Sequence, residues 1–166
     1  MSGLAGAART EPFRYAVIDL ATAEALRQYV DQLPQPTAMS LFAPSQSRAL
    51  LRVGPWLIRL SKAPEIEAIL KQFGDHVAWG FYVHSTFDIV SLRQSLRHFN
   101  LVRLRPGQKE VLFRYWDPRV MRVFLDVATR DQSARLFELI DRIEIGSVGF
   151  DARGQLHSAR AAGISQ

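Results

Sequence analysis

Hydrophobic positions follow two different spacings along the chain, and segments of the two kinds alternate. Short, mostly apolar runs that end at polar residues, proline or glycine are typical of strands buried in a sheet. They predict strands at 15–20, 39–42, 56–60, 77–84, 101–104 and 110–116, with two more short strands within 143–158. The run 77–84 (VAWGFYVH) is the best candidate for the central strand.

Apolar residues spaced three and four apart mark the helices. They predict helices at 22–33, 65–73, 89–99 and 118–128, and one more that begins after residue 129. Ser85 with Asp88, and Thr129 with Gln132, have the spacing of a capping box, and Thr22 is the expected N-cap of the first helix. The alternation predicts a single α/β (α+β) domain, with a mixed β-sheet flanked by helices and a C-terminal β-hairpin.

A second hairpin is predicted in the middle of the chain. Residues 105–108 (RPGQ) have the form of a β-turn, with proline at the second position and glycine at the third. The strand 110–116 should therefore return beside the strand 101–104.

The length and composition fit one globular domain. The chain has 166 residues, of which 48% are apolar and 22% charged, so wholesale disorder is not expected. We expect flexible tails at 1–12 and 159–166 around a domain at 13–158. There is no cysteine, which excludes disulfides and thiolate metal sites. No secretory signal pattern and no apolar run near the ~20 residues of a membrane span are visible, which is compatible with the cytoplasm.

Basic charge is concentrated in one segment. The net charge is +5, and residues 93–122 contain eight basic and two acidic residues, so the remainder is slightly acidic. One interpretation is a nucleic-acid-binding module, because clustered arginines neutralise phosphates. It would use Arg93, Arg97, Arg103 and Arg105. A protein partner with acidic groups explains the charge equally well, and the nearby Tyr115 and Trp116 suit a protein interface.

Candidate catalytic groups are few and scattered. The sequence has no metal-spaced histidine pair, no GxSxG, no GxGxxG and no Walker A motif. An enzyme would have to centre on Asp19, His84 or Asp117. Asp19 lies at the end of a strand, which is a common place for a catalytic carboxylate, but a turn-forming or capping role is the commoner one. We therefore expect no enzymatic activity, no metal and no cofactor.

The stretch 112–125 (LFRYWDPRVMRVFL) joins an aromatic run to a helix. Asp117 and Pro118 have a sufficient structural explanation, because Asp is a favoured N-cap and Pro a favoured first helical residue. Arg119 has none, since a cation is slightly unfavourable at the N-terminal end of a helix. Arg119, and Arg114 in the aromatic strand, should pair with carboxylates, either inside the domain or on a partner.

This stretch also carries a resemblance. FRYWDPRV (113–120) is similar to the FRFYDPRV-type signature of the type VI secretion effector chaperones, or adaptors, a family catalogued as a domain of unknown function. Further segments resemble the family in the same order: RYAVIDLA (14–21), MSLFA (39–43), VGPWLIRL (53–60), WGFYVHS (79–85) and LRQSLRHFNLVRL (92–104). The resemblance covers about residues 13–145. It departs at Leu20, where the family usually has glycine, and at Ala43-Pro44, where it usually has an acidic residue and glycine.

The resemblance implies a role without catalysis. Members of the family bind a specific toxic effector in the bacterial cytoplasm and help to load it onto the VgrG spike or its PAAR tip. The expected partners are therefore a cognate secreted effector and a VgrG or PAAR protein, with no membrane contact. By resemblance, the signature positions are Arg114, Asp117, Pro118 and Arg119. Whether these side chains contact the effector or stabilise the fold stays open at this point.

Overall fold

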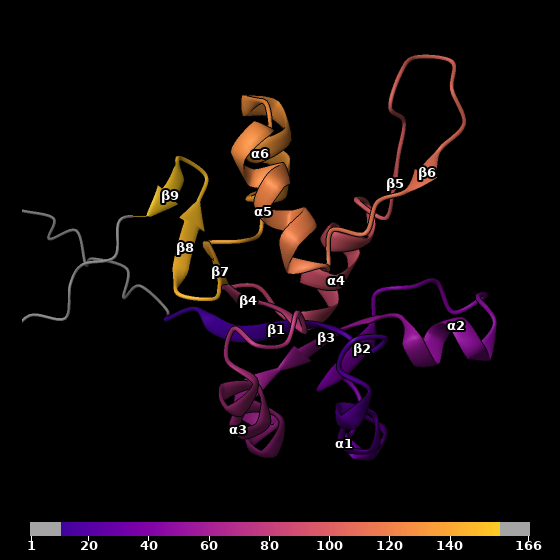
Figure 1. Ribbon diagram of the computed structural model, residues 1–166, viewed down its shortest axis with the longest axis vertical. Helices are drawn as coiled ribbons and strands as arrows, with labels where there is room; N and C mark the ends of the chain where they lie inside the picture. Colours follow the sequence, from indigo (N-terminus) through magenta and orange to yellow (C-terminus); the bar gives the residue numbers. More distant parts are fainter. Residues whose placement is uncertain (1–10, 157–166) are drawn as a thin grey trace, which may run out of the picture.

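A seven-stranded sheet crosses the middle of the protein in the computed structural model, which describes residues 11–156 (Figure 1). Its order is β2-β3-β1-β4-β7-β8-β9. These strands are β1 (Phe13–Asp19), β2 (Ala38–Ser40), β3 (Pro55–Arg59), β4 (Gly80–Ser85), β7 (Arg142–Ile145), β8 (Val148–Asp151) and β9 (Gly154–Leu156). The α/β class is confirmed, but each pair of neighbouring strands runs antiparallel, where the sequence predicted a mixed sheet. Tight turns link β7 to β8 and β8 to β9, and such turns join only antiparallel strands.

Helices cover both faces of the sheet. On one face lie α1 (Arg27–Gln32), which follows a short 3-10 turn (Glu24–Leu26), and α3 (Pro64–Phe73), which follows another (Leu60–Lys62). On the opposite face lie α4 (Ile89–Arg97), α5 (Pro118–Val127) and α6 (Arg130–Leu136), and α2 (Arg48–Val53) stands at the side (Figure 1). The two faces carry two separate hydrophobic clusters.

The residues of β1 explain this three-layer arrangement. Tyr15 and Val17 point into the cluster beneath α4, α5 and α6, while Ala16 and Ile18 point into the cluster on the α1–α3 side. All four are fully buried. A strand with both faces covered reads as an unbroken apolar run, as this one does.

The predicted central strand is confirmed, with β4 in fourth place of the seven. It begins at Gly80, whose φ is +141°. A Cβ atom there would lie 1.8 Å from the backbone oxygen of Val17. Only glycine therefore lets β4 approach β1 this closely, next to the point where β1 ends at Asp19.

Two helix starts differ from the sequence prediction. Thr22 does not cap a helix; its hydroxyl donates to the Asp19 carboxylate (3.4 Å), and the regular helix α1 begins later. The N-cap of α4 is Asp88, which accepts from the Ser91 amide (2.9 Å). Ser85 stays in β4 and donates to the backbone oxygen of Leu139. The Thr22 hydroxyl is taken by a residue three positions earlier, and the Ser85 hydroxyl by a residue 54 positions away.

The middle hairpin is present but short. It contains β5 (Leu101–Val102) and β6 (Val111–Leu112), which pair only with each other. Its turn is as predicted, with Gly107 at φ +80° and the Gln108 amide donating to Arg105 (3.2 Å). At the C-terminal end three strands form two hairpins, where two strands were predicted. The predicted tails 1–12 and 159–166 lie outside the described residues, except for residues 11 and 12.

Candidate functional site

The aromatic stretch before α5 is an irregular segment that turns into the helix. The predicted strand 110–116 ends at Leu112, so Arg114, Tyr115 and Trp116 lie outside it. Asp117 is the N-cap, accepting from the Arg119 amide (2.9 Å), and Pro118 is the first helical residue, both as predicted.

Arg119 pairs with the cap itself. Its Nε and Nη2 atoms donate to the two carboxylate oxygens of Asp117 at 3.0 and 2.8 Å. The Arg119 guanidinium and the helix amide hold the pKa of Asp117 below its ordinary value, and the same contact raises the pKa of Arg119. The Arg119 side chain is still 77% exposed, against 11% for Asp117. The pair is therefore internal, but one side of the guanidinium faces solvent.

Arg114 pairs with a carboxylate from the other end of the chain. Its Nη2 atom donates to Asp19 Oδ2 at 3.2 Å, and the Asp19 side chain is 2% exposed. Asp19 also accepts from the Ala21 amide (3.0 Å) and the Thr22 hydroxyl. Asp19 therefore closes the turn after β1 and ties this turn to the signature segment.

The two pairs lie close enough to influence one another. Arg114 contributes to the lowered pKa of Asp117, and Asp19 to the raised pKa of Arg119. The four side chains form a cluster of alternating charge, which we call the Asp–Arg cluster (Asp19, Arg114, Asp117 and Arg119). A general acid or base working near neutral pH needs a carboxyl group whose pKa is raised, whereas that of Asp117 is lowered. The cluster is suited to holding two chain segments together.

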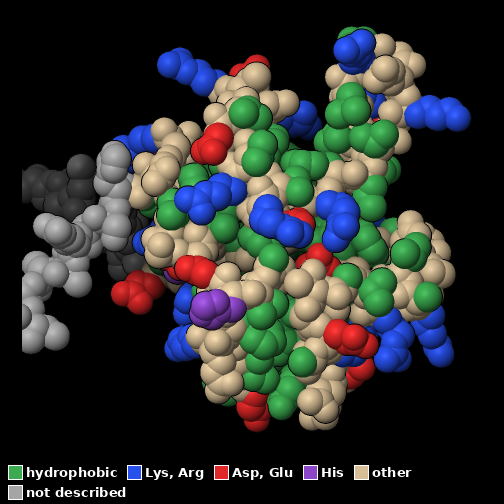
Figure 2. Space-filling view, viewed as in Figure 1, with side chains coloured by type: hydrophobic (Ala, Val, Ile, Leu, Met, Phe, Trp, Pro, Cys, Tyr) green, Lys and Arg blue, Asp and Glu red, His purple; other side chains and the backbone are tan. Residues whose placement is uncertain are grey.

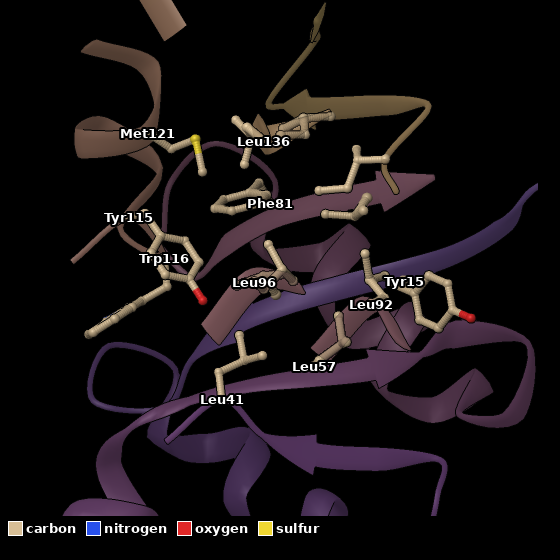
Figure 3. Close-up of a cluster of buried hydrophobic side chains, with 14 of the residues drawn as sticks. Tyr15, Leu41, Leu57, Phe81, Leu92, Leu96, Tyr115, Trp116, Met121 and Leu136 are labelled. Carbon is tan, nitrogen blue, oxygen red and sulfur yellow. The ribbon is translucent and has the colours of Figure 1, made fainter. Parts of the chain in front are cut away.

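Tyr115 and Trp116 are buried, although the sequence suggested them for a partner surface. Their exposed fractions are 1% and 3%, and their rings meet edge to face at 5.4 Å. Figure 3 places both in the cluster that also contains Leu96 and Met121. Burial raises the pKa of Tyr115, which stays a neutral phenol. The two aromatic side chains therefore anchor the signature segment (113–120) in the hydrophobic core.

The arginines of α4 have different environments. Arg93 donates to the backbone oxygens of Ser40 (2.6 Å) and Phe42 (3.2 Å), so it fixes the chain after β2. Burial and the neighbouring Arg97 lower the pKa of Arg93. Arg97 lines a cleft beside the β5–β6 hairpin. The predicted arginine-rich face is therefore divided among internal contacts, the cleft and the hairpin.

Of the three candidate catalytic groups, Asp19 and Asp117 lie in the Asp–Arg cluster, whereas His84 lies apart from it. His84 pairs in register with Arg14, at the opposite end of β1 from Asp19, and its Nε2 atom lies 3.3 Å from Glu144. Among residues 11–156, no group of three or more His, Cys, Asp or Glu side chains could hold a metal ion. Within the same residues, no helix has the length and apolar character that crossing a membrane requires.

The family comparison fits this geometry. A family model described as "Domain of unknown function (DUF4123)" matches residues 14–135. The chain belongs to the DUF4123 family. This family is associated with type VI secretion effector adaptors. A search of curated proteins and a search of solved structures found no significant match. The matched range includes both segments that the Asp–Arg cluster connects.

One functional residue pair could not be foreseen from local patterns. Asp19 and Arg114 are 95 positions apart, and no local spacing rule connects them. The available signal was weaker: an arginine near aromatic residues needs a carboxylate, and Asp19 ends a strand that was expected to lie in the sheet. The sequence thus predicted that Arg114 needs a carboxylate, but not that this carboxylate belongs to Asp19.

Proposed function

We propose that this DUF4123 protein is a non-enzymatic adaptor that binds one toxic effector in the bacterial cytoplasm. It assists the loading of that effector onto the VgrG or PAAR spike of a type VI secretion system. The family match over residues 14–135 carries the proposal. The described residues are consistent with it, because the carboxylates of Asp19 and Asp117 are engaged by arginines and backbone groups.

Co-purification tests the binding step. The protein is expressed with an affinity tag together with each candidate effector encoded next to its own gene, and the cognate effector should form a stable complex at a fixed stoichiometry. A tagged, unrelated basic protein of similar size serves as the control for charge-driven adhesion. A toxin that elutes separately at micromolar concentrations contradicts effector binding.

Gene deletion tests the loading step. Without this protein, the effector should be lost from the culture medium or degraded in the cell, while the spike and tube proteins are still secreted. Re-expression of the protein should restore effector secretion. Stable accumulation and normal secretion of the effector in the deletion strain would overturn the proposal.

Arg119 is the signature residue that tests direct contact, because its side chain is 77% exposed. Arg119→Glu reverses the charge that faces solvent, and we expect it to weaken effector binding. Because the new carboxylate also lies beside Asp117, Arg119→Met is the matched variant that removes the charge without repulsion. If Arg119→Glu unfolds the domain while Arg119→Met binds like wild type, the role of Arg119 is internal.

A further inference from the structure

A cleft of about 750 Å³ lies between α2, α4 and the β5–β6 hairpin. Its apolar wall comes from Phe42 before α2, Leu50 of α2, and Leu101 and Leu112 of the hairpin. The volume lies within the range of roughly 300–1,000 Å³ that is common for binding pockets. The wall includes Arg97 and one acidic residue, Glu110.

The apolar surface continues from the cleft along the hairpin. Four large hydrophobic side chains of this hairpin are exposed: Leu101, Leu104, Val111 and Leu112. The hairpin stands away from the main sheet (Figure 1), and hydrophobic side chains run along it toward the body of the protein (Figure 2). A two-stranded hairpin is marginally stable alone in water, and soluble monomers seldom expose a contiguous apolar patch of this kind. A partner that covers this surface would stabilise it.

The charge around the cleft is positive. The basic side chains on the three bordering elements are Arg48, Arg52, Arg93, Arg97, Arg103, Arg105 and Lys109. Of these, Arg93 donates to backbone oxygens of Ser40 and Phe42. The acid in the wall, Glu110, lies 3.5 Å from Arg103 and is thereby offset. A partner of complementary charge must therefore carry Asp or Glu.

We propose that this cleft binds an acidic amphipathic segment of the effector. Apolar side chains of the segment enter between Leu50 and Leu112, as the apolar face of a helix enters a groove. Asp or Glu residues beside them meet the arginines and speed association. The inference rests on the proposed function, because it takes the effector as the partner.

Three other occupants fit the surface less well. A small molecule would leave the exposed leucines of the hairpin uncovered. A second copy of this chain would bring two basic surfaces together, which opposes association. A single-stranded nucleic acid would be expected to find aromatic side chains for base stacking, whereas the exposed wall is mainly aliphatic.

Charged substitutions in the cleft test the proposal. Leu112 is 53% exposed and Leu50 is 47% exposed, so Leu112→Asp and Leu50→Asp are compatible with folding. The matched control is Val90→Asp, on α4, because Val90 is 54% exposed and is not a cleft residue. Binding of the purified candidate effector is measured by calorimetry. Each cleft variant should weaken binding by about tenfold or more, with the control within about twofold of wild type.

Overlapping peptides from the same effector test the chemistry of the segment. One acidic, amphipathic peptide should compete with the full effector, and its Asp→Asn and Glu→Gln version should compete less well. Circular dichroism and thermal melting of each variant show whether the fold is retained.

The outcomes separate the cleft from the adaptor role. If wild type does not bind the effector, the proposed function fails. If wild type binds and both folded cleft variants bind equally tightly, the cleft proposal fails while the adaptor role stands. Loss of self-association in sedimentation, or of single-stranded DNA binding, with effector affinity unchanged, would assign the cleft to that other occupant and overturn the proposal.

Discussion

The two ion pairs of the signature use the same chemistry in opposite settings. Arg114 reaches 95 positions along the chain to Asp19, whose carboxylate is buried and also accepts from two other groups. Arg119 reaches back two positions to Asp117, at the open end of α5. The first pair joins two distant segments of the fold. The second pair braces one helix end and leaves a cation facing solvent.

Within one short motif, therefore, one ion pair stabilises the fold and the other leaves a side chain available to a partner. An ion pair contributes to stability mainly when removing one partner leaves the other buried without its donors. Removing Arg114 takes a donor from a carboxylate that is 2% exposed, whereas removing Arg119 takes donors from Asp117, which is 11% exposed and lies at the start of a helix. One short motif can thus contain one residue that stabilises the fold and another that can contact a partner.

The largest effect is expected at Asp19. Asp19→Ala leaves the Ala21 amide, the Thr22 hydroxyl and the Arg114 guanidinium without their common acceptor. We expect the free energy of unfolding to fall by about 2–3 kcal/mol, because three part-buried hydrogen bonds lose their charged acceptor. Urea denaturation followed by circular dichroism measures the change.

A matched control is Asp31→Ala. Asp31 also pairs with an arginine, Arg27, but one helical turn away and with an exposed carboxylate. Its loss should cost about 0.5 kcal/mol or less. Equal losses for the two variants would contradict the distinction between the long-range and the local pair.

The next effect is expected for Arg114→Met, which keeps the length of the side chain and removes its charge. Asp19 retains two donors, and Arg114 is 55% exposed, so the loss should be smaller, about 1.5 kcal/mol. In a double-mutant cycle with Asp19→Asn, the two changes should be clearly non-additive. Additive losses would mean that the Arg114–Asp19 contact contributes nothing to stability.

The sequence carried enough information for local elements. Asp117-Pro118 begins α5 and Thr129 with Gln132 forms a capping box, because caps depend on residues within one turn. Two capping assignments failed. Ser85 donates to Leu139, a contact that arises only once distant segments have come together. Thr22 instead donates to Asp19, three positions earlier, in the turn after β1.

The same division applies to the site. The need of Arg114 and Arg119 for carboxylates followed from charge and burial, and Arg119 found the nearest one. Tyr115 and Trp116 were assigned to a partner surface, but the strand expected at 110–116 ends at Leu112 and both of these side chains are buried. Alternation along a strand cannot be applied to residues that are not in one.

A smaller loss in the free energy of unfolding is expected for Asp117→Ala. It removes the acceptor for the Arg119 amide at the first turn of α5 and should cost about 1 kcal/mol, the usual value for an N-cap. Thermal unfolding at neutral pH measures it. Asp126→Ala, in the last turn of the same helix, is the control and should not destabilise the helix, because a negative charge there is unfavourable. A loss of similar size for Asp126→Ala would argue against the capping explanation.

At low pH, wild type and Asp117→Asn should have the same free energy of unfolding. The pKa of Asp117 is lower in the folded protein than its ordinary value, so its charge favours folding at every pH above the unfolded pKa, near 3.9. As the pH falls through the lower folded pKa, this contribution disappears. Stability curves of the two proteins should therefore run parallel above about pH 5 and converge below about pH 4. Curves that stay parallel down to the lowest pH would show that the carboxylate charge is not involved.

The smallest effect on stability is expected for Arg119→Met. The guanidinium is exposed, and Asp117 keeps the helix amide as a donor when Arg119 is gone, so the unfolding transition should stay close to that of wild type. A double-mutant cycle with Asp117→Asn should give a coupling well below that of the Arg114–Asp19 cycle, measured in the same urea series. Equal coupling energies in the two cycles would mean that the Arg119–Asp117 and Arg114–Asp19 pairs contribute equally to stability. A small coupling, combined with weaker effector binding by Arg119→Glu, would place Arg119 at the effector-binding surface. Arg114 would then be the arginine that stabilises the fold.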